Sequence, residues 1–228
     1  MKLSIVLPSY LEEENLRILI PRIKTEISKI TLENEIVIVD TSTPLDNTLG
    51  VCNENQVVYL NRKGGNTYGD AIRTGLSAAK GEYIVFMDAD GSHPPEFIHE
   101  LYNQRNSGDV IIASRYIEGG FTENSRPLIL MSKIVNWGYS FILNIKCKDV
   151  SNSFRLYKGD FVRSLDLKCS NFDIVEEILY KLIKRNKSLK ILEIPFSFKQ
   201  RMFGQTKRNL FSFVFSYIFT LIRLRLMR

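Results

Sequence analysis

The sequence predicts an α/β fold in which helices flank a mainly parallel β-sheet. Over the first two thirds of the chain, short apolar runs rich in β-branched residues alternate with segments whose apolar residues recur at helical spacing. Several of the apolar runs end in polar residues. The 228 residues, 44% of them hydrophobic, suffice for one large domain with a buried core, or for two small domains at most.

This alternation defines the expected elements in order. The first strand covers Leu3 to Leu7 and ends at Pro8, and a helix follows over 15–30, where apolar residues recur every three or four positions. Further strands are expected at 35–39, 56–60, 83–87 and 110–113. Further helices are expected at 68–79, which Gly81 terminates, and at 96–106, which Pro94 and Pro95 introduce.

The pattern changes after Ser114. Residues 127–145 are strongly apolar and include Trp137 and Phe141. The remaining elements are expected to be a polar turn leading into a strand at 149–157, an amphipathic helix at 172–183 and a strand at 191–198. Neither an internal repeat nor a low-complexity linker interrupts the sequence, which favours a single domain.

Polar groups follow three of the expected strands. They are Pro8-Ser9-Tyr10 after the first strand, Asp40 after the second and Asp88 after the fourth. The carboxyl ends of parallel strands meet at one edge of a sheet, and ligands of such sheets bind beyond that edge. We therefore expect a binding site where these three segments converge.

Asp88-Ala89-Asp90 is the segment with the clearest chemistry. An apolar strand ends in two carboxylates one residue apart, and alternate side chains of extended backbone point the same way, so both can approach one cation. Carboxylates, phosphate oxygens and water form the oxygen shell that Mg²⁺ or Mn²⁺ prefers, and such an ion neutralises charge on a diphosphate leaving group. A surface acidic turn is the alternative interpretation. The preceding strand and the following Ser92-His93-Pro94-Pro95-Glu96 favour the metal site.

Charge and cysteine content narrow the class of protein only partly. The net charge of +6 fits nucleic acid, phosphorylated metabolites or an anionic membrane, but no nucleic-acid-binding motif accompanies it, so we expect no nucleic-acid partner. Cys52, Cys147 and Cys169 are isolated, which predicts reduced thiols in a cytosolic protein rather than a zinc site or a disulfide framework. The sequence opens directly on an apolar strand, so no signal peptide is expected.

Seven segments occur in an order and spacing typical of a known family. They are Ile5–Asn15, Ile36–Asp40, Gly69–Gly75, Asp88–Glu96, Ala113–Gly120, Asp149–Arg155 and Ile194–Lys207. Together they resemble dolichyl-phosphate mannose synthase-like glycosyltransferases of family 2, and the resemblance covers nearly the whole chain. It implies the GT-A fold, a Rossmann-like and mainly parallel sheet flanked by helices, with C-terminal amphipathic interface helices.

The resemblance also implies roles for single residues. Those implied to bind the donor nucleotide are Pro8, Tyr10, Glu12, Asp40, Asp88, Ala89 and Arg201. Those implied to hold a Mg²⁺ or Mn²⁺ cofactor are Asp88, Asp90 and Ser92. Those implied to be catalytic are Asp90, Arg115 and Lys207. Arg115 and Arg126 are implied to hold an acceptor phosphate, a task that suits the planar, two-donor fork of a guanidinium.

Two positions depart from the family pattern. Thr41 stands where a second aspartate is usual, and Ser153 stands where glycine is usual. Because the missing aspartate lies in the expected base-binding segment, the base of the donor, GDP or UDP, stays open.

The resemblance predicts an inverting hexosyltransferase. Its donor is a nucleotide diphosphate sugar of the GDP-mannose or UDP-glucose type, and its acceptor is a polyprenyl phosphate. A phosphate is already ionised and needs no general base, whereas a sugar hydroxyl needs one. One alternative is therefore a family 2 enzyme of surface-polysaccharide assembly that acts on a glycan or lipid-linked sugar, with Asp149, Glu176 or Glu177 as base. Another is an inactive sugar-nucleotide-binding protein, which only Thr41 supports.

The acceptor suggests a membrane surface. We expect a catalytic domain over 1–206, with an amphipathic interface helix inserted at 127–145, and a basic amphipathic membrane-interface segment over 207–228. The apolar stretch from Leu210 to Ile222 is shorter than the roughly 20 residues that cross a bilayer. We therefore expect peripheral attachment to the cytoplasmic face of a membrane, with an integral membrane partner or a homo-oligomer as further options. The alternative without a membrane is that both apolar segments pack in an ordinary hydrophobic core or in a dimer interface.

Overall fold

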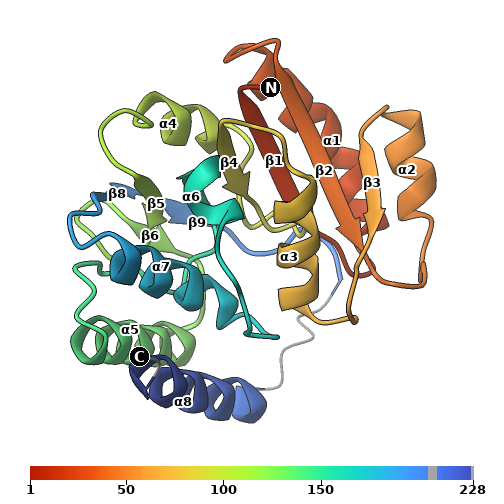
Figure 1. The fold of residues 1–228 in the computed structure, drawn as a ribbon. Coiled ribbons are helices and arrows are strands. Elements are labelled where there is room, and N and C mark those ends of the chain that lie inside the picture. The colour runs from red at the N-terminus through yellow and green to blue at the C-terminus, as the bar shows by residue number, and fades with distance from the viewer. Residues whose placement is uncertain (205–209, 227–228) are drawn as a thin grey trace.

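A seven-stranded sheet forms the centre of the molecule (Figure 1). The computed structural model describes residues 1–204 and 210–226. The strand order is β3-β2-β1-β4-β7-β5-β8, and only β7 runs antiparallel to its neighbours. The strands are β1 (Leu3–Pro8), β2 (Asn34–Asp40), β3 (Val58–Asn61), β4 (Tyr83–Phe86), β5 (Val110–Ser114), β7 (Arg155–Lys158) and β8 (Ile191–Pro195). The predicted mainly parallel α/β fold is confirmed.

Helices cover both faces of this sheet because successive strand side chains point to opposite faces. Ile5 and Leu7 belong to one buried cluster and Val6 to the other. The first cluster includes residues of α1 (Glu13–Ser28), α2 (Thr48–Glu54) and α4 (Phe97–Asn103). The second includes residues of α3 (Tyr68–Ala78), α5 (Arg126–Ile142), α6 (Gly159–Arg163), α7 (Ile174–Arg185) and α8 (Leu210–Leu226).

The topology of the sheet predicts a crevice between β1 and β4. The chain proceeds from β1 to β2 and β3 on one side, and then crosses back through α3 to β4 on the other side of β1. At such a switch point the two outgoing connections diverge, which opens a ligand-binding crevice beyond the carboxyl ends of the strands. Ser9 follows β1 and Asp88 follows β4 at this edge.

Some element boundaries differ from the sequence prediction for local reasons. The strand expected from Gln56 begins at Val58, because Gln56 adopts a φ of 53° that does not belong to a strand. The strand expected over 191–198 divides at Phe196. Its N–H donates to Ser114 O, and its carbonyl accepts from Phe121 N, so the chain leaves β8 for β9 (Ser197–Phe198). There β9 pairs with β6 (Phe121–Thr122) as a small second sheet.

Two apolar helices lie side by side at the lower edge of Figure 1. The hydroxyl of Tyr139 on α5 donates to the carbonyl of Tyr217 on α8 at 2.8 Å, and their rings contact edge to face. The apolar segment expected at 127–145 forms a helix, α5, only as far as Ile142. Within residues 1–204 and 210–226, no helix combines the length and the apolarity that crossing a membrane requires.

Candidate active site

The turn after β4 presents Asp88 and Asp90 at the crevice. Ala89 is buried in the core, and the two carboxylates on either side of it are partly exposed. Gly91 follows with a φ of 84°, a conformation that an L side chain rarely adopts. The predicted pair of neighbouring carboxylates at a strand end is therefore present.

Hydroxyl groups hold one oxygen of each carboxylate. Oδ1 of Asp88 accepts a hydrogen bond from Ser153 Oγ at 3.1 Å and a longer one from Tyr68 at 3.4 Å. Oδ1 of Asp90 accepts from Ser92 Oγ at 2.6 Å and from its backbone N–H at 3.0 Å. Ser92 is buried and its hydroxyl is directed at Asp90. Its assignment as a direct metal ligand stays a prediction.

His93 fixes the turn from behind. Its ring is fully buried and stacks on Phe154, with 4.6 Å between ring centroids. Nδ1 accepts the backbone N–H of Asp88 at 3.0 Å. Burial lowers the pKa of His93, although the nearby Asp88 carboxylate opposes this; the shift favours the neutral imidazole, whose Nδ1 can accept that bond. The sequence interpretation gave His93 no role beyond the motif.

Glu12 and Arg201, both predicted to bind the donor, are in contact although they lie far apart in the chain. Arg201 Nη2 donates to Glu12 Oε1 at 2.9 Å, and Asn15 Nδ2 donates to Glu12 Oε2. Burial raises the pKa of Glu12, and the attraction of Arg201 opposes that rise. The backbone N–H of Met202 donates to the carbonyl of Asp90 at 2.8 Å. The structure thus brings two predicted donor-binding residues together, and Met202, next to Arg201, binds the turn of Asp88 and Asp90.

Asp40, which the sequence predicts to bind the donor nucleotide, is the last residue of β2. It is almost fully buried, and its Oδ2 accepts from the hydroxyl of Tyr59 at 3.0 Å. Burial raises the Asp40 pKa, while the hydrogen bonds from Thr41 and Tyr59 oppose the rise. Thr41, in place of the family's second aspartate, donates to the carbonyl of Thr43 at 2.7 Å. Its hydroxyl therefore organises the loop.

Arg62 lies beside the predicted site residues, and the sequence interpretation did not include it. It follows β3 directly, is 7% exposed, and donates to the backbone carbonyls of Ser9 and Asn66. Its guanidinium lies 6.0 Å from the ring centre of Tyr10, which is itself partly exposed at the crevice. The rule that located Asp40 and Asp88, a polar residue at the carboxyl end of a strand, also applies to Arg62.

Arg115 is held by Asp149. Its Nε and Nη2 donate to the two carboxylate oxygens at 2.8 and 2.7 Å, and its backbone N–H donates at 2.9 Å. Burial alone would lower the pKa of Arg115, but the Asp149 charge and hydrogen bonds raise it above its usual range. The guanidinium also lies 5.5 Å from the ring centre of Phe198. Arg115 is therefore a fixed cation.

The other predicted cations are placed differently. Arg126 is exposed at the first position of α5, and among the described residues it forms no hydrogen bond or ion pair. Lys207 lies outside the described residues. The assignment of each to the site therefore stays a prediction.

The two aspartates suit a hard divalent cation. None of the described residues donates a hydrogen bond to Oδ2 of Asp88 or of Asp90, although Nε2 of His93 lies 3.9 Å from Oδ2 of Asp88. One carboxylate oxygen of each aspartate can therefore accept a ligand. No group of three or more acidic, histidine or cysteine side chains in the described part of the chain is arranged to hold a metal ion. Two carboxylates would then bind Mg²⁺ or Mn²⁺ together with oxygens from a diphosphate and water.

Comparison with known proteins settles the family. The model of the family described as Glycosyl transferase family 2 matches residues 4–166. The chain belongs to glycosyltransferase family 2. It is 34% identical over 215 residues to a dolichol-phosphate mannosyltransferase of Pyrococcus furiosus, covering 91% of this chain but 59% of that protein's length. It is 28% identical over 219 residues to a polyprenol monophosphomannose synthase of Mycolicibacterium smegmatis, covering 90% of this chain and 80% of that protein.

The fold of this family 2 glycosyltransferase matches solved structures along its whole length. Glucosyl-3-phosphoglycerate synthase of Mycobacterium tuberculosis, crystallised with Mn²⁺, UDP and phosphoglyceric acid, aligns with 100% of this chain and 79% of its own, with a TM-score of 0.76 and 17% sequence identity. At this identity the match shows the fold alone. The expected GT-A fold and the resemblance to polyprenyl-phosphate mannosyltransferases are confirmed.

The carboxylates considered as a general base are all buried in this glycosyltransferase. Asp149 has both oxygens bound by Arg115. Glu177 accepts from two backbone N–H groups and from Lys181. Glu176 is 0% exposed, and burial raises its pKa to about 8, although the charge of Arg155 opposes the rise. All three are therefore shielded from solvent, unlike Asp88 and Asp90.

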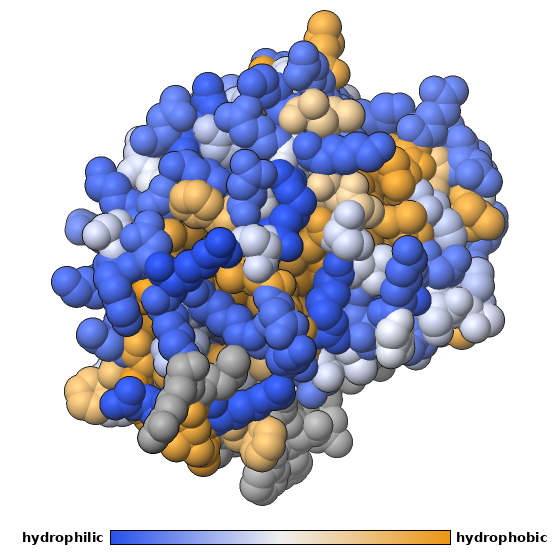
Figure 2. All heavy atoms as spheres, in the orientation of Figure 1, coloured by the Kyte–Doolittle hydropathy of each residue, from blue (hydrophilic) through white to orange (hydrophobic). Residues whose placement is uncertain are grey.

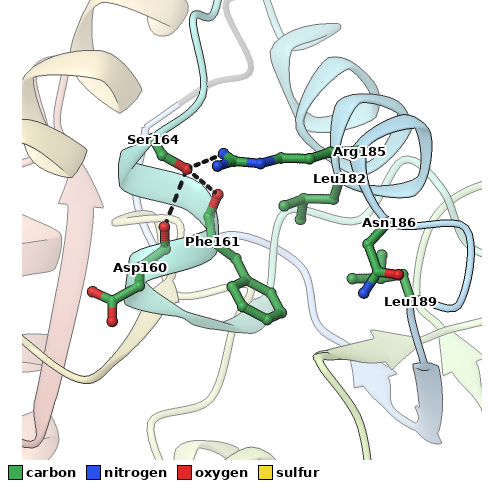
Figure 3. A pocket seen from close by; sticks show the side chains of 7 residues that line it. All are labelled: Asp160, Phe161, Ser164, Leu182, Arg185, Asn186 and Leu189. Atoms are coloured by element: carbon green, nitrogen blue, oxygen red, sulfur yellow. Dashed lines mark hydrogen bonds between the residues drawn. The ribbon is translucent and has the colours of Figure 1, made fainter.

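A separate hollow of about 250 Å³ lies between α6 and α7 (Figure 3). Phe161 and Leu182 line it, and Arg185 crosses it to donate to Ser164. The Asp160 carboxylate pairs with Arg163 instead of facing the hollow. None of the predicted site residues lines this hollow, so the crevice at Asp88 remains the candidate active site.

Proposed function

We propose that this chain transfers a hexose, with inversion, from a nucleotide diphosphate sugar to a polyprenyl phosphate. The observation that carries the proposal is the contrast between the carboxylates. Asp88 and Asp90 are open at the crevice, whereas Asp149, Glu176 and Glu177 are buried. Asp88 and Asp90 can help to stabilise a leaving diphosphate, whereas the three buried carboxylates are not available as a general base. This contrast favours an acceptor that is already ionised.

The proposed reaction follows from these positions. A phosphate oxygen of the acceptor, oriented by Arg115 and Arg126, attacks the anomeric carbon as the bond to the donor diphosphate breaks. The configuration at the anomeric carbon inverts, and the nucleoside diphosphate leaves on the side of Asp88 and Asp90. A bound Mg²⁺ or Mn²⁺ would supply charge neutralisation for that leaving group. Both ions are known from crystal structures of the M. tuberculosis relative with UDP.

The membrane surface is the second part of the proposal. Large apolar side chains are exposed along α5 at Leu130, Ile134, Trp137 and Phe141, and along α8 at Phe219, Ile222 and Leu226. Some orange atoms show at the lower edge of Figure 2, where α5 and α8 lie, interspersed with blue ones. Arg223 and Arg225 are exposed on α8 beside them. Apolar stripes with adjacent cations suit the interface of an anionic membrane, here the cytoplasmic face.

The test is an acceptor comparison. The protein is incubated with Mn²⁺, labelled GDP-mannose or UDP-glucose, and either undecaprenyl phosphate or the corresponding alcohol, undecaprenol. We expect label to enter the organic phase with the phosphate only, because the alcohol would need a base. Label that stays in water with every donor would reject the proposal. Transfer to the alcohol at a similar rate would favour the alternative that uses a base.

A further inference from the structure

The acceptor side of the site is connected to α5 through one loop residue. Ser151 precedes β7, and its backbone N–H donates to Oδ1 of Asn136 on α5 at 2.9 Å. Its hydroxyl accepts a hydrogen bond from Nη2 of Arg115 at 3.0 Å. Ser151 therefore joins a side chain of α5 to the arginine proposed to bind the acceptor phosphate.

Asn136 is itself tightly held. It is 2% exposed, and its Nδ2 donates to the carbonyl of Ser132, one turn earlier in the helix, at 2.9 Å. This bond orients the amide so that Oδ1 points to Ser151. A buried amide is costly unless its groups are hydrogen-bonded, and asparagine is a weak helix former. Its place on the inner face of an apolar helix therefore indicates a specific polar requirement.

The donor count of Arg115 shows what this arrangement achieves. A guanidinium has five N–H groups: one on Nε and two on each terminal nitrogen. Asp149 takes the N–H of Nε and one N–H of Nη2, and Ser151 takes the second N–H of Nη2. Among the described residues, none accepts from Nη1. The two N–H groups of Nη1 are therefore left for a ligand.

We propose that Asn136 is a positioning residue for the acceptor: through Ser151 it orients Arg115 so that Nη1 faces the acceptor phosphate. The inference rests on the proposed function and names how its acceptor site is built. It also assigns α5 two roles on opposite faces. The outer face carries exposed Trp137 and Phe141, and the inner face carries Asn136. A lipid phosphate that approaches from a membrane at the outer face of α5 would bind Arg115, and the orientation of Arg115 depends on Asn136 of the same helix.

A double-mutant cycle of Asn136→Ala and Ser151→Ala tests this. Transfer rates are measured while the concentration of undecaprenyl phosphate is varied and, separately, while the concentration of the donor sugar nucleotide is varied. We expect each single variant to raise the KM for the acceptor about tenfold, as the loss of one hydrogen bond implies, with the donor KM unchanged. Because both act through one loop, the double variant should be no worse than the poorer single variant.

Controls separate positioning from general damage. Ser151→Thr keeps the hydroxyl and the N–H, so its acceptor KM should stay near that of the parent. Asn103→Ala removes an exposed asparagine of α4 that bonds within its own helix, and should change neither KM. Equal rises in both KM values, or additive effects in the double variant, would overturn the inference. An inactive parent protein would instead reject the proposed function.

Discussion

At the scale of single residues, the candidate metal site depends on which oxygen of each aspartate is already hydrogen-bonded. Ser153 occupies Oδ1 of Asp88, and Ser92 occupies Oδ1 of Asp90. In both carboxylates Oδ2 is left for a cation. Side chains that fix a ligating group in this way commonly change metal affinity tenfold or more when they are removed.

Ser153→Ala should therefore weaken the metal-assisted binding of nucleotide. The Asp88 carboxylate would lose its shorter hydroxyl partner and keep only the longer bond from Tyr68. We expect the Mn²⁺ affinity, measured by calorimetry with GDP or UDP present, to fall about tenfold, with metal-free nucleotide binding unchanged. Ser153→Thr should restore the affinity. Ser164→Ala, in the distant hollow between α6 and α7, serves as the control.

Residue patterns located the carboxylates but not their partners. Asp88 and Asp90 were predictable because they end an apolar strand. Ser153 lies 65 positions from Asp88 in the sequence, and a hydroxyl carries no spacing pattern of its own. The partnership of Arg115 with Asp149 was hidden for the same reason, because a contact between distant loops depends on the packed sheet. Arg62, by contrast, follows a strand directly and was within reach of the strand-end rule.

At the scale of elements, β7 and α7 show how packing overrides local pattern. The four residues Arg155–Lys158 are too few to indicate direction, and they insert antiparallel between β4 and β5. Helix α7 was predictable from its apolar spacing. Yet both adjacent glutamates, Glu176 and Glu177, are buried, and only their surroundings distinguish them.

Glu176→Gln should stabilise the protein increasingly as pH rises. Burial raises the folded-state pKa of Glu176 to about 8 from an ordinary value of 4.5, despite the opposing charge of Arg155. Between these pH values the native state binds more protons than the unfolded state, so stability falls with rising pH. A neutral glutamine avoids that loss. Melting temperatures of parent and variant should nearly coincide at about pH 4, below the ordinary pKa, with the variant higher at about pH 8.

The neighbouring Glu177→Gln is the matched control, with the opposite sign. Burial works against the Glu177 charge, but Lys181 and the backbone N–H of Cys169 lower its pKa below the usual value. Its contribution is present above the unfolded-state pKa and lost as pH falls through the lower folded-state value. Glu177→Gln should therefore destabilise the protein at neutral pH. A Glu176→Gln variant less stable than the parent at every pH would show that Glu176 is ionised beside Arg155.

At the scale of the whole molecule, α5 links two surfaces that the sequence presents separately. On its buried side Asn136 binds Ser151, which in turn binds Arg115, and its exposed side carries large apolar residues, as α8 does. Arg126, at the start of the same helix, is exposed and forms no bond to any described residue. If the acceptor is a lipid phosphate, α5 would then contact both the membrane that contains the lipid and the phosphate group of the lipid.

This arrangement predicts that membrane binding and acceptor use fail together. Replacing Trp137 and Phe141, which are 68% and 72% exposed, by glutamate puts charge into the apolar stripe without disturbing a buried contact. We expect the variant to lose sedimentation with vesicles containing phosphatidylglycerol and to lose activity on undecaprenyl phosphate, while nucleotide binding by thermal shift is retained. Leu32→Glu, at a position that is 90% exposed and lies outside α5 and α8, should bind vesicles as the parent does. Because part of the attraction is electrostatic, vesicle binding by the parent protein should weaken as the salt concentration rises.

A different result would contradict the membrane assignment. If the parent protein forms a dimer in solution and does not bind vesicles, the exposed apolar residues of α5 and α8 would instead form an interface with a second copy of the chain.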